Sequence, residues 1–170
     1  MRVRVRLVLA GLAAVVAVAA VLLITPTRET GAQGPAQPIA FSHKLHAGDF
    51  RIDCQYCHAD ARRSPYAGIP SVKRCMGCHQ IVGADRPEVQ KLQQLWKDGR
   101  AIPWVRVHKI PGFVHFPHKR HVQAGVACQS CHGPVQAMAV VAQVAPLTMG
   151  WCVECHAARR APLDCVVCHH

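Results

Sequence analysis

The chain has 170 residues, a formal net charge of +11 and only 5% aromatic residues, so the sequence excludes a domain built around a large aromatic core. It also contains ten cysteines and twelve histidines, which is unusual for its length. No segment resembles a nucleic-acid-binding fold, so we expect no nucleic-acid partner despite the basic balance.

The N-terminal segment predicts a membrane anchor. MRVRVR is basic, and Leu7 to Ile24 form an apolar run of eighteen residues. Cleavable signal peptides usually have a shorter apolar region of about 7–15 residues, whereas about 18 or more can span a bilayer. We therefore predict an uncleaved anchor over residues 1–25 with its arginines in the cytoplasm, although GAQ near position 32 leaves cleavage open. Residues 26–40 are predicted to be a linker.

Two stretches of the chain begin with the same pattern, F-x-H-x-x-H. Phe41 starts FSHKLH and Phe116 starts FPHKRH, 75 residues later. Each is followed after seven or six residues by C-x-x-C-H, and then after sixteen or nineteen residues by a second C-x-x-C-H. This self-similarity predicts two halves, residues 41–79 and 116–156, related by duplication.

The C-x-x-C-H pattern occurs five times and uses all ten cysteines. In chain order the five motifs are Cys54, Cys57 and His58; Cys75, Cys78 and His79; Cys128, Cys131 and His132; Cys152, Cys155 and His156; and Cys165, Cys168 and His169. This spacing is typical of c-type haem attachment, in which the two thiols bond the porphyrin and the histidine binds its iron. The fifth motif falls in the tail, residues 157–170.

Other uses of a C-x-x-C pair explain less. A redox dithiol, half a zinc site or a disulfide framework all need paired cysteines, but none requires a histidine directly after every second cysteine. We therefore predict five covalently bound haem c groups within residues 41–170. The predicted fold is mostly loops and short helices wrapped around those five haems. So small a chain lacks a large side-chain core, and the covalent bonds to the haems would cross-link it instead.

Seven further histidines are candidates for the second axial position of each iron. The H-x-x-H pairs, His43 with His46 and His118 with His121, supply four, and residues three apart on a helical turn can serve two different haems. His108 lies in WVRVHKIP, whose alternation predicts an extended segment between prolines, and we expect it to be the fifth distal ligand. His170 and Met149 are the alternative candidates for an axial ligand.

Between the two halves, DRPEVQKLQQLWKDG predicts a helix. Asp85 is the expected N-cap, Pro87 lies in the first turn and Gly99 is the expected stop. Val89, Leu92 and Trp96 would share one face. We expect this face to pack internally as part of a spacer helix rather than to bind a partner.

The motifs resemble two groups of cytochromes. F-x-H-x-x-H ahead of C-x-x-C-H is similar to the class III multihaem cytochromes, whose haems carry histidine on both faces. The stretch IPWVRVHKIPGFVHFPHKRHV, with CQSCHGPV and PLTMGWCVECH, resembles the pentahaem cytochrome subunit of alternative complex III, a bacterial quinol oxidoreductase. His115 stands where that family has an aromatic residue, so it is not counted as a ligand.

That resemblance implies a single-pass subunit of the bacterial inner membrane, with its haem domain on the periplasmic side. It would relay electrons from quinol to a cytochrome or terminal oxidase. The implied partners are an iron–sulfur subunit, polytopic quinol-binding subunits and a monohaem cytochrome c. An independent membrane-anchored quinol dehydrogenase or electron shuttle is the alternative. A catalytic multihaem reductase is disfavoured because no lysine-bearing C-x-x-C-K site occurs, and no catalytic residue is predicted.

Overall fold

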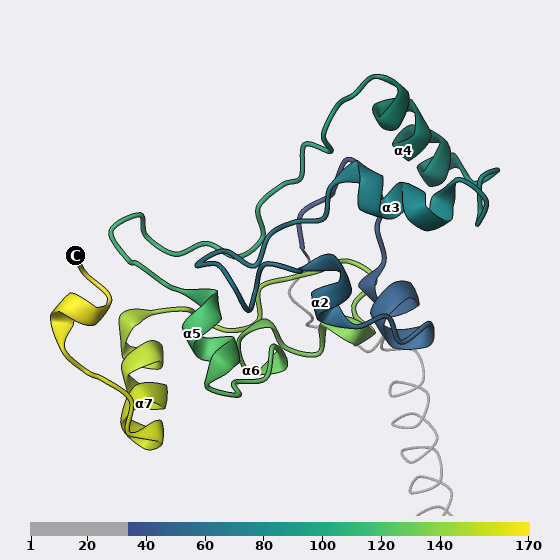
Figure 1. Ribbon diagram of the computed structural model, residues 1–170. Helices are drawn as coiled ribbons and strands as arrows, with labels where there is room; N and C mark the ends of the chain where they lie inside the picture. Colours follow the sequence, from purple (N-terminus) through teal and green to yellow (C-terminus); the bar gives the residue numbers. More distant parts are fainter. Residues whose placement is uncertain (1–33) are drawn as a thin grey trace, which may run out of the picture. The chain divides into compact units, whose positions relative to one another are not determined.

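The computed structural model describes residues 34–170, in which short helical segments are joined by loops and no β-strand occurs (Figure 1). This confirms the predicted loops and short helices. The described helices are η1 (Lys44–Asp49), α2 (Cys54–Cys57), α3 (Val72–His79), α4 (Pro87–Lys97), α5 (His118–Gln123), α6 (Gln129–His132), η2 (Val135–Ala137), α7 (Met149–Arg159) and η3 (Cys165–Val167).

The predicted anchor, residues 1–25, lies outside the described residues, as does most of the predicted linker. Within residues 34–170, none of the helices combines the length and the apolar character that crossing a membrane requires.

The hydrophobic core of the described residues is small and lies around α3 and α4, which pack side by side (Figure 1). Val72 and Met76 of α3 meet Leu92 of α4, with Ile39 and Ile102 completing the cluster. Residues 34–170 contain eight buried hydrophobic residues, and five of them belong to this cluster. The polypeptide in this part of the chain therefore builds one local core rather than a core for the whole unit.

Helix α4 differs from the sequence prediction at its start and agrees with it at its end. The N-cap is Arg86 and not Asp85, because Pro87 is the first helical residue. Gly99 adopts a positive φ of 65°, and the next amide, that of Arg100, donates to the carbonyl of Leu95 over 2.9 Å. This is the hydrogen bond with which a glycine ends a helix.

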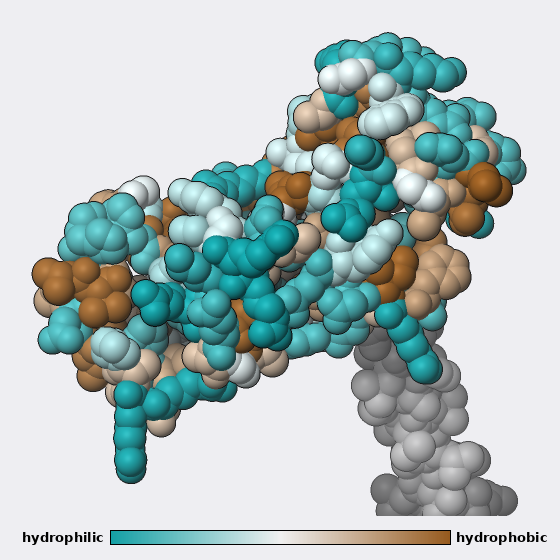
Figure 2. Space-filling model, viewed as in Figure 1, coloured by the Kyte–Doolittle hydropathy of each residue, from teal (hydrophilic) through white to brown (hydrophobic). Residues whose placement is uncertain are grey.

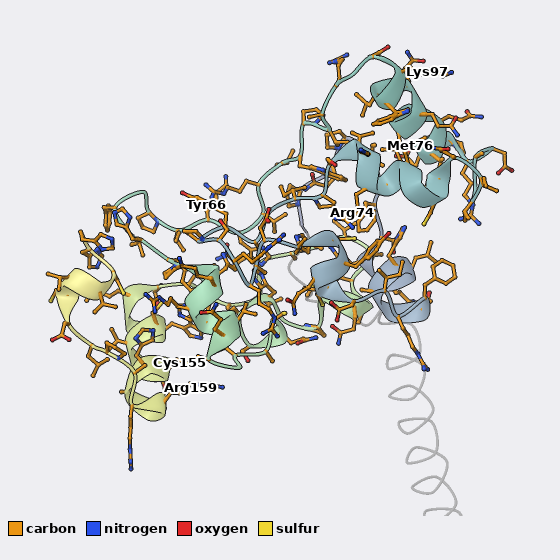
Figure 3. The ribbon with its side chains drawn as sticks, viewed as in Figure 1. Tyr66, Arg74, Met76, Lys97, Cys155 and Arg159 are labelled. Atoms are coloured by element: carbon orange, nitrogen blue, oxygen red, sulfur yellow. The ribbon has the colours of Figure 1, made fainter. Side chains whose placement is uncertain are left out.

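Only part of the predicted apolar face of α4 is buried. Val89 and Leu92 are buried, whereas Trp96 is 43% exposed. The expected internal packing of the helix is thus confirmed for its first two turns. Lys97, at the end of the helix, is exposed (Figure 3).

Two extended segments flank this core and bond to each other. The side chain of Gln37 accepts from the amide of Val105 and donates to its carbonyl, over 2.9 and 3.0 Å. The amide of Ala40 donates to the carboxylate of Glu88 in α4 over 2.8 Å. The chain entering the first half is therefore fixed against residues 102–105 just before Phe41.

The two predicted halves are bonded together and belong to one compact unit. The amide of His118 at the start of α5 donates to the carbonyl of Pro65, and that of Lys119 to the carbonyl of Ser64. In return, η1 packs on η2, where the amide of Lys44 donates to the carbonyl of Met138 over 2.9 Å. Each half therefore supports the helix that carries the histidine pair of the other.

The surface of this unit is mixed in character. The face shown in Figure 2 carries hydrophobic side chains scattered among hydrophilic ones, and hydrophobic atoms also gather over the C-terminal segment at the left. Leu163 and Val166 of this segment are 55% and 71% exposed. The tail holding the fifth motif therefore has little side-chain core of its own.

Candidate haem-binding sites

Each cysteine pair lies in or at the edge of a helical turn. The first motif forms α2, the second ends α3, the third runs into α6, the fourth lies in α7 and the fifth forms η3. Residues three and four apart share a face of a helix, so the two thiols and the following imidazole can approach one ligand together. Among the described residues, none of the ten cysteines is joined to another in a disulfide.

Local capping explains why two of these turns form. Before α2, the carboxylate of Asp53 accepts from the amide of Gln55 over 2.8 Å. Before α7, the hydroxyl of Thr148 accepts from the amide of Trp151 over 3.4 Å. Such N-caps satisfy amides at the start of a helix that have no partner inside it. The first and fourth motifs thus each begin on a capped helix.

The motif histidines are oriented through Nδ1. That nitrogen lies 2.6 Å from the carbonyl of Gly68 in His58, 2.8 Å from that of Val82 in His79, 2.7 Å from that of Pro162 in His156 and 3.2 Å from that of Phe113 in His169. A carbonyl only accepts, so Nδ1 carries the proton in these four rings. Nε2 then keeps its lone pair for a metal, as in most metal-binding histidines.

The H-x-x-H histidines follow the same rule. Nδ1 of His46 donates to the carbonyl of Ser42 over 2.9 Å, and Nδ1 of His121 donates to that of Pro117 over 3.1 Å. Nδ1 of His118 lies 2.9 Å from the carbonyl of Pro65. Nδ1 of His43 is buried without a partner. Three of the four therefore also present Nε2 as the free donor atom.

Two pairs of imidazoles face each other with nearly parallel ring planes. His43 lies opposite His58 with 6.5 Å between ring centroids and 2° between planes, and His118 lies opposite His132 at 6.4 Å and 6°. Two imidazoles bound to opposite sides of one metal, each through a bond of about 2.0 Å, have centroids about 6 Å apart once the ring radius is added. The spacing therefore fits one six-coordinate iron between each pair.

The second histidine of each H-x-x-H pair faces a different motif. His46 lies opposite His79 with 6.0 Å between centroids and 64° between planes, and His121 lies opposite His156 at 6.0 Å and 46°. The sequence indicated that one H-x-x-H pair can serve two haems but left the partners open. The structure brings the first histidine of each pair to the nearer motif and the second to the farther one.

The phenylalanine that opens each repeat packs on both histidines after it. Phe41 stands edge-on to His43 at 4.8 Å and stacks on His46 at 4.4 Å. Phe116 repeats this with His118 at 4.9 Å and with His121 at 4.3 Å. The sequence analysis gave this residue no role, although its place in both repeats was the signal. It holds the two rings in their orientations.

His108, the histidine expected as the fifth distal ligand, lies beside the third motif. Its ring centroid is 4.4 Å from that of His132, and its Nε2 is 3.2 Å from Nδ1 of His132. Nδ1 is on the edge of His132 away from the nitrogen that binds iron. His108 therefore lies next to Nδ1 of a motif histidine, His132.

The fifth motif is held by the loop before α5. Besides the bond from His169 to the carbonyl of Phe113, the amide of His115 donates to the carbonyl of Cys168 over 2.8 Å. The rings of His115 and His170 stack at 4.3 Å. The ring of Phe113 lies 5.8 Å from that of His169. Met149, the other alternative candidate, is the first residue of α7 and is 67% exposed.

Burial sets the protonation of several site groups. It is the main cause that lowers the pKa of His43 to about 4 and the pKa of His132 to about 4, with neighbouring histidines adding to the effect. Both rings are therefore neutral at pH 7, which is the form that binds a metal. Burial likewise raises the pKa of the thiols of Cys57, Cys75 and Cys131 before any haem is attached.

Neighbouring thiols reveal the order of the motifs in space. Burial is the largest cause of each raised cysteine pKa, and a cysteine of another motif is a further cause. These further neighbours are Cys128 for Cys54, Cys78 for Cys57, Cys152 and Cys155 for Cys131, and Cys168 for Cys152. The motifs therefore adjoin one another in the order second, first, third, fourth, fifth.

Other contacts agree with this order. The guanidinium of Arg74, just before the second motif, lies over the ring of Tyr56 inside the first, 5.0 Å from its centroid. Cys155 of the fourth motif lies on α7 (Figures 1 and 3). In this order, each motif adjoins the next.

Comparison with known proteins agrees with this geometry. The class III cytochrome c family matches residues 21–109, more than half of the chain, and cytochrome c7 and related cytochromes c match residues 114–170. The chain is also 35% identical over 97 residues to the menaquinone reductase multiheme cytochrome c subunit of Nitratidesulfovibrio vulgaris (strain Hildenborough). That alignment covers 56% of this chain and 45% of the relative, so the chain spans less than half of that protein.

The donor set, the opposed imidazoles and the family matches lead to the same cofactor. The chain carries several covalently attached c-type haems, bound through its cysteine pairs. It is a multihaem cytochrome c, and it belongs to the class III cytochrome c family.

Proposed function

We propose that this cytochrome is the electron-transfer subunit of a membrane-bound quinone oxidoreductase complex. The observation that carries the proposal is the set of five adjoining motifs, four of which have a second imidazole opposite the motif histidine. The similarity to a subunit of a menaquinone reductase supports the quinone partner. The predicted anchor at residues 1–25 would hold the haem domain at the periplasmic face of the bacterial inner membrane.

The proposed sites use all five motifs and therefore five haems. Proposed axial pairs are His58 with His43, His79 with His46, His132 with His118, and His156 with His121. For the fifth motif we propose His169 as the motif-side ligand. Each haem, once bound, supplies a one-electron couple whose potential depends on its axial ligands and surroundings.

The protein residues make these sites suitable for relay rather than for catalysis. An imidazole on each side of an iron leaves no position for a substrate. Nδ1–carbonyl bonds and the packing of Phe41 and Phe116 fix the rings, so little rearrangement is needed when charge changes. The adjacency of the motifs lets electrons enter at one end of the row and leave at the other.

The direction of electron flow has two candidates. The resemblance to alternative complex III favours flow from quinol to a cytochrome or terminal oxidase, through an iron–sulfur subunit, polytopic quinol-binding subunits and a monohaem cytochrome c. The relative's name favours the opposite flow, into menaquinone. Both directions use the same row of haems. We propose the first, because the stretch IPWVRVHKIPGFVHFPHKRHV with CQSCHGPV and PLTMGWCVECH resembles the alternative complex III subunit.

Purification in mild detergent followed by reduction assays tests this proposal. The cytochrome should purify with polytopic subunits, and quinol should reduce its haems in that complex. The isolated cytochrome should be reduced by dithionite but only slowly by quinol, because quinone sites normally need several helices or an interface.

Each part of the proposal has its own contrary outcome. An isolated chain that oxidises quinol as fast as the complex would establish the alternative, an independent quinol dehydrogenase. If quinol does not reduce the complex, but the complex passes electrons from a reduced soluble cytochrome to menaquinone, the direction of electron flow is the opposite of the one proposed.

A further inference from the structure

One motif histidine has a different partner from the other four. His58, His79, His156 and His169 place Nδ1 against a backbone carbonyl, whereas Nδ1 of His132 faces the imidazole Nε2 of His108 over 3.2 Å. The partner comes from 24 residues earlier in the chain. In the third motif, the partner of Nδ1 is therefore a side chain, whereas in the other four motifs it is a backbone carbonyl.

The chain after the third motif differs from that after the first, second and fourth. The carbonyls that serve the first, second and fourth motifs come from three to ten residues further along. After His132 the chain turns at once at Gly133, where φ is 68° and where a Cβ atom would lie 2.5 Å from Val144. Glycine suits this turn, because it adopts the positive φ and has no Cβ atom to meet Val144.

The protons in this bond can be assigned. When Nε2 of His132 binds iron, its Nδ1 must carry the remaining proton, so His132 is the donor. Nε2 of His108 is then the acceptor, and His108 holds its own proton on Nδ1. The two ring planes are nearly perpendicular, at 84°, with Nδ1 of His132 directed at His108.

We propose that His108 is a positioning residue for His132 and not an axial ligand, a role that rests on the proposed binding of iron by His132. An imidazole nitrogen is a more basic acceptor than an amide carbonyl. Accepting the Nδ1 proton therefore makes His132 a stronger electron donor to its iron and fixes the orientation of its ring. Stronger donation favours the ferric state and lowers the reduction potential of this haem.

The position of this haem gives the bond a consequence for the relay. The third motif lies in the middle of the row, between the first and the fourth. Electrons that move along the adjoining motifs from either end would pass it. His108 thus sets the potential of the central step, while the other four motif histidines keep the ordinary carbonyl partner.

The test is His108→Ala in the full-length cytochrome, studied by electron paramagnetic resonance and by redox titration at one fixed pH. We expect the same number of low-spin haems as in the unchanged protein, with the potential of one haem raised. His108→Gln, whose amide oxygen can accept the proton, should restore the potential in part. Val107→Ala, an uncharged change in the same segment, is the control and should leave all potentials unchanged.

Every other result would overturn the proposal. A new high-spin ferric signal in His108→Ala would make His108 an axial ligand, as the sequence pattern suggests. An unchanged titration would show that the bond to His132 has no effect on the haem. A failure of the proposed axial pairs themselves would be visible separately, as high-spin haems in the unchanged protein.

Discussion

At the scale of single residues, the two nitrogens of each imidazole divide the work in this cytochrome. Nδ1 is engaged by a carbonyl in seven of the twelve histidines, and this leaves Nε2 for iron. The histidines are thus oriented by the main chain before any metal binds, which is the usual device of metal sites. His108 is the exception that serves another histidine.

Removing one H-x-x-H histidine should open one iron. In His43→Ala the first motif keeps Cys54, Cys57 and His58, so haem attachment should be unaffected, but the opposing imidazole 6.5 Å away is lost. We expect one haem to become high-spin in the ferric state, or to shift its potential, with the covalent haem count unchanged. Low-temperature electron paramagnetic resonance and intact-mass spectrometry measure the two quantities.

The same substitution at His118 is the matched test in the second half. It should affect one haem in the same way, because His118 lies opposite His132 at 6.4 Å. His115→Ala, which removes an imidazole stacked on His170, is the control. If both His43→Ala and His118→Ala keep every haem low-spin with unaltered potentials, the proposed axial pairs are wrong.

The angles between opposed rings predict two kinds of low-spin signal. The pairs on the first and third motifs are nearly parallel, at 2° and 6°, whereas those on the second and fourth are twisted by 64° and 46°. Parallel imidazole planes separate the iron d-orbitals and give a rhombic spectrum, and twisted planes move the largest g-value upward. His46→Ala should therefore remove intensity only from the signal with the larger maximum g-value, which comes from the twisted pairs. Loss of intensity from the rhombic signal would contradict the pairing of His46 with His79.

At the scale of elements, the two repeats have the same motifs, but the segment between H-x-x-H and C-x-x-C-H is one residue longer in the first. In the first half the amide of Ile52 donates to the carbonyl of His46, six residues back, and in the second the amide of Val126 donates to that of His121, five residues back. The additional residue is absorbed in η1, a π-helix in which the amide of Phe50 donates to the carbonyl of Leu45. A π turn accommodates an inserted residue without moving the helix start.

The packing of α3 against α4 is the element contact that side chains alone maintain. Leu92 is 5% exposed and belongs to the cluster with Val72 and Met76. Leu92→Ala should destabilise this local core by about 2–5 kcal/mol, because it removes buried methyl groups and leaves a cavity. Chemical denaturation followed by tryptophan fluorescence measures the loss, since Trp104 packs against the cluster.

Lys97→Ala is the matched control in the same helix. Its side chain is exposed at the end of α4, so its removal should change the free energy of unfolding by about 0.5 kcal/mol or less (Figure 3). If Leu92→Ala costs no more than Lys97→Ala, the cluster contributes nothing to stability and α4 is held only through its loops.

At the scale of the whole molecule, the motifs replace the side-chain core that the composition excludes. Only eight hydrophobic residues are buried among residues 34–170, yet the cysteines of successive motifs adjoin one another throughout that part of the chain. Covalent attachment at ten cysteines would staple the loops that so small a core cannot hold. The arrangement ties stability to cofactor loading.

The number of haems follows from the same arrangement. Five motifs use all ten cysteines, so the mature protein should have the mass of the polypeptide plus five haems. Intact-mass spectrometry of the denatured protein measures this directly, because thioether bonds survive denaturation. Treatment with reagents that reduce disulfides should leave this mass unchanged, because they do not cleave thioether bonds. A mass corresponding to four haems or fewer would show that one motif is not a haem site.

The sequence by itself determined the attachment chemistry, the short helices and most of helix α4, and it predicts the duplication. These depend on residues close together in the chain, where the spacing of cysteines, histidines, proline and glycine has a direct physical meaning. The expected N-cap at Asp85 was wrong because Pro87 begins the helix one residue later. The anchor at residues 1–25 stays a prediction.

The tertiary structure alone decided which imidazoles face each other, the order of the motifs and the place of His108. His43 and His58 are 15 residues apart in the chain, His121 and His156 are 35 apart, and Cys54 meets Cys128 from the other half. Such contacts depend on how the halves pack, and no local pattern encodes that packing. For His108, which the sequence indicates as an axial ligand, only the fold shows that its Nε2 lies at Nδ1 of His132.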